Sequence, residues 1–418
     1  MAGNLRFGAA LLSICWLSQL GLAQSASSSE LSLGEKAYVA SKIYSAINLY
    51  FAHWQGVPNL DLDSGYKEYL DKALKAGSRT DFDLATYEFI ARLRNGHTFF
   101  SDKWMDDNHG QPLGFFAVWE GGKWVITSSR RADLQPGGVI QAIGERTMDD
   151  FFKQEEKYIP ASTERWARRA LFERAYLFPG KFTLALEGGK EVVIDRRDQK
   201  LAPPPTLETQ GRWITEGTIG YIKVPSFGDP KFEEAAIKYT KEFGKGRSLL
   251  IDVRGNHGGS TPGQLTAALM DRPYSWYQES TTAHLGVMEA TESNVLFSLT
   301  WSGETTTPEN ALFKGRVFIL ADAGCFSACE DFVVPFKANH RAVIIGEATG
   351  GSSGQPYMHG FGNGMFLGIG AKREHFPDGS EFEGVGVAPD VEVHPTPQDF
   401  RTGDDPVLKR AIEIASQP

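Results

Sequence analysis

The second half of the chain alternates between short apolar runs and amphipathic segments, and this alternation limits the possible folds more than any other feature. Strands are expected at residues 220–224, 248–253, 317–320 and 342–345, with helices at 230–243, 262–270 and 327–337. This order predicts an α/β domain in which helices cover a parallel or mixed sheet. A stiff run of prolines suits a boundary, so the domain is expected to span residues 205–418.

The first half of the chain has a different pattern. Residues 30–110 carry apolar side chains at helical spacing and predict an N-terminal helical cap. Residues 111–200 hold strand-like runs separated by Gly-Gly turns, which predicts a compact β-rich module inserted before the α/β domain. A chain of 418 residues is long enough for each of these units to bury its own core.

Residues 1–23 are typical of a secretory signal. They combine Arg6 with an apolar stretch and with small residues at Gly21 and Ala23. We therefore expect a secreted or periplasmic protein, with no stable membrane span after cleavage behind Ala23. An uncleaved N-terminal anchor is the alternative interpretation.

Charge and cysteine content exclude several kinds of partner. The net charge is −9, and no basic run offers the clustered positive face that nucleic acid requires. Cys325 and Cys329 remain after the signal, too few ligands for a zinc site. A disulfide between them is possible in an oxidising compartment, but their four-residue spacing at a helix start fits disulfide geometry poorly, so two buried thiols are the preferred expectation. No metal or organic cofactor is expected.

Three polar turns follow predicted strands, at the sheet edge where α/β proteins place their sites. The first ends in Gly258-Gly259, whose freed N–H groups could face an anion, although a plain loop is the simpler interpretation. The second holds Ser327 at a helix start, where a serine is either a cap or an exposed nucleophile. The third, residues 346–354, lacks the ending of a phosphate-binding loop.

In this order the turns resemble peptidase family S41, which includes the carboxyl-terminal processing proteases, the tricorn protease core and the retinoid-binding repeats. The matching stretches are Gly-Tyr-Ile at 220–222, Asp-Val-Arg-Gly-Asn-His-Gly-Gly at 252–259, Ser-Ala-Cys-Glu at 327–330, the segment 341–347, and Glu-Gly-Val-Gly-Val-Ala-Pro-Asp at 383–390. The resemblance implies a ClpP/crotonase-like mixed sheet and a PDZ-like character for residues 111–200. Gly138 stands where that module usually has an Asp, so the module looks degenerate.

The chain departs from the processing proteases at their general base. Their lysine position falls on Ser352, and a neutral hydroxyl cannot take a proton from a serine. The tricorn-like branch uses a histidine from the cap and a glutamate, which match His97 and Glu383 here. His257 is the reserve base. The tricorn pattern also has a serine before its histidine, where this chain has Gly96.

These matches predict a secreted serine peptidase that works through an acyl-enzyme. Ser327 would be the nucleophile, His97 the base, and Glu383 the group that orients the imidazole directly, through Thr98 or through a water. The N–H groups of Gly259 and Ala328 would form the oxyanion hole. The substrate would be a polypeptide, engaged at its carboxyl terminus if the PDZ-like module binds it. Two alternatives stay open, an inactive S41-like protein that binds a ligand or peptide and a non-peptidase hydrolase such as an esterase.

Overall fold

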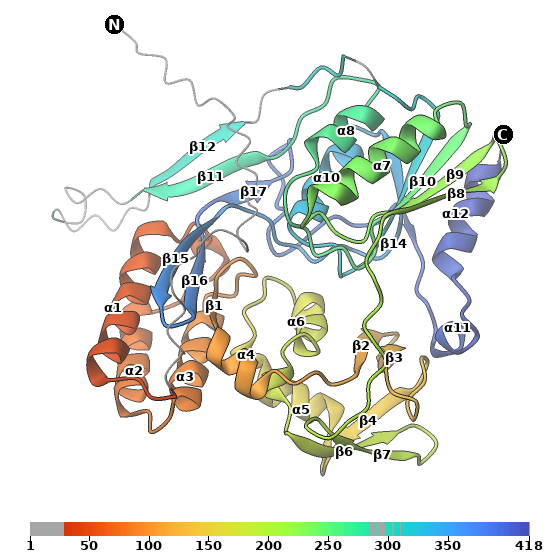
Figure 1. Cartoon of the computed structure of the whole chain (residues 1–418). Helices are drawn as coiled ribbons and strands as arrows, with labels where there is room; N and C mark the ends of the chain where they lie inside the picture. The colour runs from red at the N-terminus through yellow and green to blue at the C-terminus, as the bar shows by residue number, and fades with distance from the viewer. Residues whose placement is uncertain (1–28, 284–289, 291–296, 303–304, 310, 418) are drawn as a thin grey trace, which may run out of the picture.

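The computed structural model describes residues 29–283, 290, 297–302, 305–309 and 311–417 (Figure 1). The predicted signal segment lies outside this range. Within it, no helix has both the length and the apolar character that crossing a bilayer requires.

A six-stranded sheet forms the centre of the C-terminal half. Its strands follow the order β18-β14-β13-β10-β9-β8, and neighbours are parallel except for the edge strand β8, which is antiparallel to β9. The central strands are almost fully buried because helices cover both faces. The strands are β8 (Gln210–Thr215), β9 (Ile219–Lys223), β10 (Ser248–Asp252), β13 (Arg316–Ala321), β14 (Ala342–Gly346) and β18 (Val391–Glu392).

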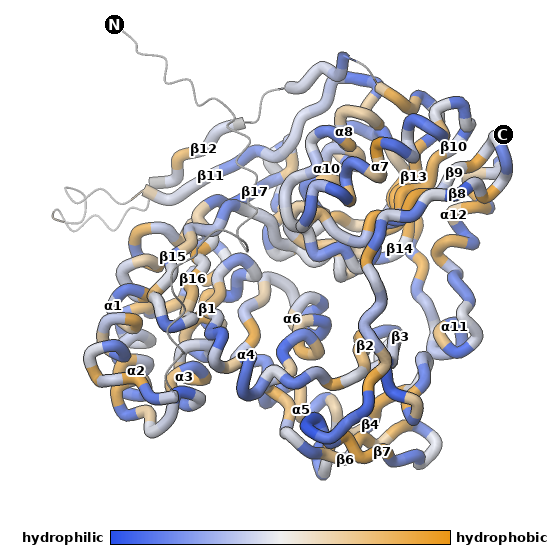
Figure 2. The backbone as a smooth tube through the Cα atoms, in the orientation of Figure 1, coloured by the Kyte–Doolittle hydropathy of each residue, from blue (hydrophilic) through white to orange (hydrophobic). Residues whose placement is uncertain are grey.

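Helices cover the two faces of this sheet unequally. One face packs on α7 (Pro230–Glu242), α8 (Gly263–Leu269) and α10 (Ala328–Ala338), while α12 (Pro406–Ser416) covers the other. Figure 2 shows the strongest hydrophobic colour along β10 and β13, between these layers. The mixed α/β architecture agrees with the alternation in the sequence.

The N-terminal region combines helices with strands from the far end of the chain. Helices α1 (Leu33–Tyr50), α2 (Leu62–Lys75) and α3 (Arg79–Ala91) share one apolar core with a three-stranded sheet. In that sheet β1 (Phe99–Asp102) pairs with β16 (Met365–Gly370), which pairs with β15 (Pro356–Gly362). The turn between α3 and β1, residues 95–98, is thereby fixed against the C-terminal half.

Residues 115–195 form a β-rich module with its own apolar core. Its core also contains Phe326, the residue before Ser327, so the module contacts the second polar turn directly. Its elements are β2 (Phe115–Glu120), β3 (Lys123–Ser129), β4 (Val139–Ile143), β5 (Arg146–Thr147), α5 (Met148–Glu155), α6 (Glu164–Leu171), β6 (Lys181–Leu186) and β7 (Glu191–Asp195). Among the described residues, the remaining α-helices and strands are α4 (Lys103–His109), α11 (Pro397–Thr402) and the sheet of β11 (Gln278–Ala283), β12 (Phe297–Ser302) and β17 (Arg373–His375).

Candidate active site

Ser327 lies at the turn between β13 and α10. Its backbone has φ +59°, a left-handed conformation that a residue with a side chain seldom adopts. Its side chain makes no capping hydrogen bond to α10, although the residue occupies the N-cap position. The hydroxyl is therefore available for another partner, and strained backbone of this kind is common at functional sites.

That partner is His97, which reaches Ser327 from the N-terminal region. The Nε2 atom of His97 lies 2.9 Å from the Ser327 Oγ, although the two residues are 230 positions apart. Burial, followed by the nearby charge of Lys372, lowers the pKa of His97 to about 4. The imidazole is therefore neutral at pH 7 and able to accept a proton.

An aromatic stack holds the imidazole in place. The ring of Phe326 stacks on His97 with centroids 4.9 Å apart and on Trp166 with centroids 3.9 Å apart. Trp166 belongs to α6, so the β-rich module supports the face of the imidazole through Phe326. An aromatic face also favours a cation beside it, which would stabilise a protonated His97.

The second ring nitrogen of His97 contacts Ser352. The Nδ1 atom lies 2.9 Å from the Ser352 Oγ. Glu330 of α10 holds the Ser352 segment because its buried carboxylate accepts the N–H groups of Gly351 at 2.8 Å and Ser352 at 3.0 Å. The backbone N–H of Ser327 donates in turn to the Ser352 carbonyl. Ser352 is thus tied to both the imidazole and the serine turn.

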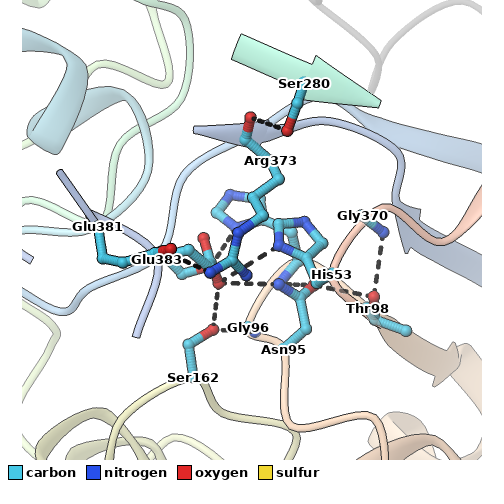
Figure 3. A network of polar contacts seen from close by, with 12 residues as sticks. His53, Asn95, Gly96, Thr98, Ser162, Ser280, Gly370, Arg373, Glu381 and Glu383 are labelled. Atoms are coloured by element: carbon cyan, nitrogen blue, oxygen red, sulfur yellow. Dashed lines mark hydrogen bonds and ion pairs between the residues drawn. The ribbon is translucent and has the colours of Figure 1, made fainter. Parts of the chain in front are cut away.

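Glu383 lies behind Ser352 and His97. It makes no direct hydrogen bond to the imidazole, which was one of the ways in which it was expected to orient the ring. Its Oε1 accepts hydrogen bonds from Asn95 at 2.9 Å and from Ser162 at 2.5 Å (Figure 3). Burial raises the pKa of Glu383 to about 7, against the opposing effect of the Ser162 and Ser352 hydroxyls. Two residues connect Glu383 to His97: Ser352 contacts the Nδ1 atom, and Asn95, which donates to Glu383, accepts the backbone N–H of His97.

The Gly-rich turn at 254–259 packs directly against the serine turn. A side chain on Gly258, whose φ is +88°, would place its Cβ 2.6 Å from the Phe326 carbonyl and 2.9 Å from the Ser327 Cβ. The N–H of Gly258 donates to the Asn256 side chain. Within the described chain, the N–H groups of Gly259 and Ala328 have no such acceptor. Both predicted oxyanion donors are therefore unoccupied.

The expectation of two free thiols beside Ser327 is wrong. Cys325 and Cys329 form a disulfide, with their Cα atoms 5.3 Å apart. The positive φ of Ser327 accounts for this, because Cys325 lies ahead of the helix and the chain turns sharply between the two cysteines. The resulting Cα separation lies in the usual range for a bridge.

Comparisons of sequence and structure show which known proteins this chain is similar to. The model of peptidase family S41 matches residues 218–393. The region 218–393, which includes Ser327 and Glu383 but not His97, is thus similar to peptidase family S41. It is 23% identical over 284 residues to the chloroplastic carboxyl-terminal-processing peptidase 2 of Arabidopsis thaliana, covering 65% of this chain and 48% of that protein. It is 26% identical over 206 residues to tricorn protease homolog 2 of Streptomyces coelicolor, covering 49% of this chain and 16% of that protein.

The crystal structure of mature CPAF has a fold similar to that of this chain. Its TM-score is 0.67 at 15% identity, over 92% of this chain and 96% of that one. The similarity extends through the N-terminal region and the β-rich module as well as the sheet. The chain spans about half or less of the length of the two curated relatives above.

The structure clarifies two departures from S41 patterns. Ser352, at the lysine position of the processing proteases, contacts the imidazole instead. The nearby Lys372 is paired with Glu279 at 2.5 Å and Glu374 at 2.8 Å. Burial alone would lower the pKa of Lys372, but these carboxylates outweigh it and raise the pKa, so this ammonium is no substitute base.

Gly96, the position before the histidine, lies beside Ser352 and Phe326. A Cβ on Gly96 would lie 2.8 Å from the Phe326 ring and 3.4 Å from the Ser352 Cβ. A serine at position 96 would collide with Phe326, and Ser352 fills the neighbouring space.

Sequence reasoning missed several residues that build the site. The sequence indicates only that Ser352 stands where the processing proteases have a lysine and that Glu330 belongs to a motif. It does not indicate that Ser352 contacts His97 or that Glu330 anchors the Ser352 segment. Asn95 precedes the Gly-His pair and gives a weak signal, whereas nothing around Ser162 indicates its role. The reserve base, His257, instead lies near Arg169 and Glu173, at 3.2 and 3.4 Å. The described side chains that could share a metal ion, Glu120, Glu347 and His394, include none of the residues around Ser327.

Proposed function

We propose that this chain is a secreted or periplasmic serine peptidase in which Ser327 attacks a peptide carbonyl and His97 is the general base. The observation that carries the proposal is the 2.9 Å contact between the His97 Nε2 and the Ser327 Oγ. It joins an uncharged base to a hydroxyl that has no capping role, which is the geometry that activates a serine.

The first half of the reaction forms an acyl-enzyme. The Ser327 Oγ bonds to the carbonyl carbon, its proton passes to Nε2, and the carbonyl π electrons move to the oxygen. The N–H groups of Gly259 and Ala328 donate to that oxyanion, and Ala328 adds the positive end of the α10 dipole. Collapse of the intermediate breaks the C–N bond, and the imidazolium gives its proton to the leaving amine.

Hydrolysis then repeats these steps with water. His97 takes a proton from the water as its oxygen bonds to the acyl carbon, and returns that proton to Ser327 as the ester bond breaks. The carboxylic acid product is released and the serine hydroxyl is restored. These steps require no metal or organic cofactor.

Ser352 and Glu383 orient and stabilise the base. In the neutral imidazole that accepts at Nε2, the Nδ1–H donates to the Ser352 Oγ. The Ser352 hydroxyl then faces Glu383, whose pKa it helps to hold down. An ionised Glu383 behind Ser352 favours the imidazolium that forms when Ser327 attacks.

The substrate is proposed to be a polypeptide, because the relatives' names describe carboxyl-terminal processing and tricorn proteases. We extend this to engagement of a carboxyl terminus by a PDZ-like module at residues 111–200. The support for the module's part in the site is the Trp166–Phe326 stack, which links it to the serine turn.

The alternative is an inactive S41-like protein that binds a peptide without cutting it. The loss of the lysine at position 352 favours this alternative. The His97–Ser327 contact and the free N–H groups of the oxyanion hole argue against it, because peptide binding alone requires neither.

Incubation of the protein with an unfolded polypeptide distinguishes a peptidase from an inactive peptide-binding protein. The chain and its Ser327→Ala variant are mixed with the polypeptide, and new termini are mapped by mass spectrometry. The proposal expects cleavage by the wild type alone. Equal binding by both proteins, with no new termini from either, would establish the inactive alternative. The same substrate with an amidated carboxyl terminus tests terminus recognition and is expected to be cut more slowly.

A further inference from the structure

A histidine and two glutamates from distant segments converge on the side of the β-rich module that faces the central sheet. Glu120 ends β2, Glu347 follows β14, and His394 lies just after β18. One potential ligand atom from each residue lies within 4.8 Å of the others. None of the three belongs to the machinery around Ser327, so this inference does not depend on the proposed peptidase activity.

The spacing of these atoms suits a single ion. The His394 Nδ1 is 2.9 Å from the Glu120 Oε1 and 3.9 Å from the Glu347 Oε1. In a tetrahedral zinc site with bonds of about 2.0–2.2 Å, neighbouring ligand atoms are about 3.3–3.6 Å apart. The observed separations lie on either side of this range, so small side-chain rotations would bring all three atoms to an ion.

The imidazole also has the support that metal-binding histidines usually have. Its other nitrogen, Nε2, lies 2.9 Å from the Glu392 Oε1. A carboxylate behind the ring fixes which nitrogen carries the proton and increases the basicity of the one facing the ion. The backbone adds a second constraint, because the N–H of Val393 donates to the Gly346 carbonyl and holds His394 beside Glu347.

The three side chains differ in exposure, with Glu347 at 23% and His394 at 51%. The Glu120 side chain is only 6% exposed. Both glutamates line a cavity of about 540 Å³, which leaves room for a water or another ligand on the ion.

We propose that Glu120, Glu347 and His394 bind one Zn²⁺ ion, with a fourth position open to this cavity. One imidazole nitrogen with two carboxylate oxygens suits Zn²⁺ better than Ca²⁺ or Mg²⁺, which prefer oxygen ligands alone. The ion would connect the end of β2 in the module to the segment that leads from β14 to Ser352. Its role would be to hold the module and that segment together.

Measurement of zinc binding tests this proposal. The tag-free chain is first dialysed against a chelator to remove any bound metal. Isothermal titration is expected to give one Zn²⁺ per chain, with no competition from a tenfold excess of Ca²⁺ or Mg²⁺. His394→Ala is expected to weaken binding at least 100-fold. His359→Ala is the matched control, because His359 lies on β15 outside the cluster, and it should bind as the wild type does.

Glu392→Gln provides a second variant if His394→Ala does not fold. The Glu392 side chain is 70% exposed, so the substitution should not affect folding, and loss of an outer carboxylate costs about 10- to 100-fold in affinity. No zinc uptake by the wild type would overturn the proposal. Equal Zn²⁺ affinity in the wild type and in His394→Ala would also overturn it. If His394→Ala cannot be purified, equal Zn²⁺ affinity in the wild type and in Glu392→Gln would do the same.

Discussion

Two segments meet at Ser327, and they are held in place by different means. The turn at 254–259 is fixed by Arg254, which pairs with Asp252 and Asp405 at 2.7 Å each. The segment at 349–352 is fixed by the single carboxylate of Glu330, which accepts two backbone N–H groups and the Thr349 hydroxyl. The first segment presents backbone N–H groups, and the second presents a side-chain hydroxyl.

This difference determines what each segment tolerates. A site made of backbone N–H groups depends on chain conformation, so it requires glycine where the chain approaches Ser327 closely. A site made of one hydroxyl depends on side-chain identity and on the carboxylate that anchors its loop. Substitutions should therefore harm the first segment through shape and the second through lost hydrogen bonds.

The largest effect is expected from Gly258→Ala in the 254–259 turn. The new Cβ would overlap the Phe326 carbonyl, and the φ of +88° disfavours a side chain. Displacement of the oxyanion donors should lower kcat by about 10²- to 10³-fold. Peptide hydrolysis measures this, with Gly263→Ala as a control because its Cβ would meet nothing within 4 Å. Full activity in Gly258→Ala would remove this turn from the mechanism.

A smaller effect is expected from Ser352→Ala in the other segment. The variant leaves the Nδ1–H of His97 buried without its acceptor, at a cost of about 1–3 kcal/mol. If that cost falls on the transition state, kcat/KM drops by about 10- to 100-fold. Ser353→Ala is the neighbouring control, because the Ser353 hydroxyl donates to Asp331 instead. Equal rates for the two variants would mean that Ser352 does not orient the base.

The smallest effect is expected in the pH profile. Burial raises the pKa of Glu383 to about 7, so its ionised form dominates only above that pH. If the negative charge favours the His97 imidazolium, kcat/KM should fall as the pH drops below about 7. Glu383→Gln should be slower and should lose this step, leaving the decline that follows the His97 pKa of about 4. An unchanged step in Glu383→Gln would assign it to another group.

The segments 254–259 and 349–352 also differ in how well the sequence predicts them. The Asp-Val-Arg-Gly-Asn-His-Gly-Gly stretch predicts a sharp turn after a strand, because paired glycines allow the backbone to turn tightly, while its part in a site came from the family resemblance. The alternation of strands and helices likewise predicted the central sheet. In both cases the signal is local.

The rest depends on contacts between distant parts of the chain. Ser352 meets His97 across 255 positions, and Asn95 meets Glu383 across 288. The pairing of β1 with β16 brings these parts together, and no periodicity in either strand specifies that partner. The Cys325–Cys329 bridge was misjudged for a related reason, because the spacing gave no sign of the positive φ at Ser327.

Fluorophosphonate labelling followed by intact mass and peptide mapping tests the central claim most directly, that His97 activates Ser327. The account predicts one label per chain, on Ser327, and its loss in both Ser327→Ala and His97→Ala. Circular dichroism checks that each variant is folded. Labelling of Ser327 at the wild-type rate in a folded His97→Ala protein would contradict the account.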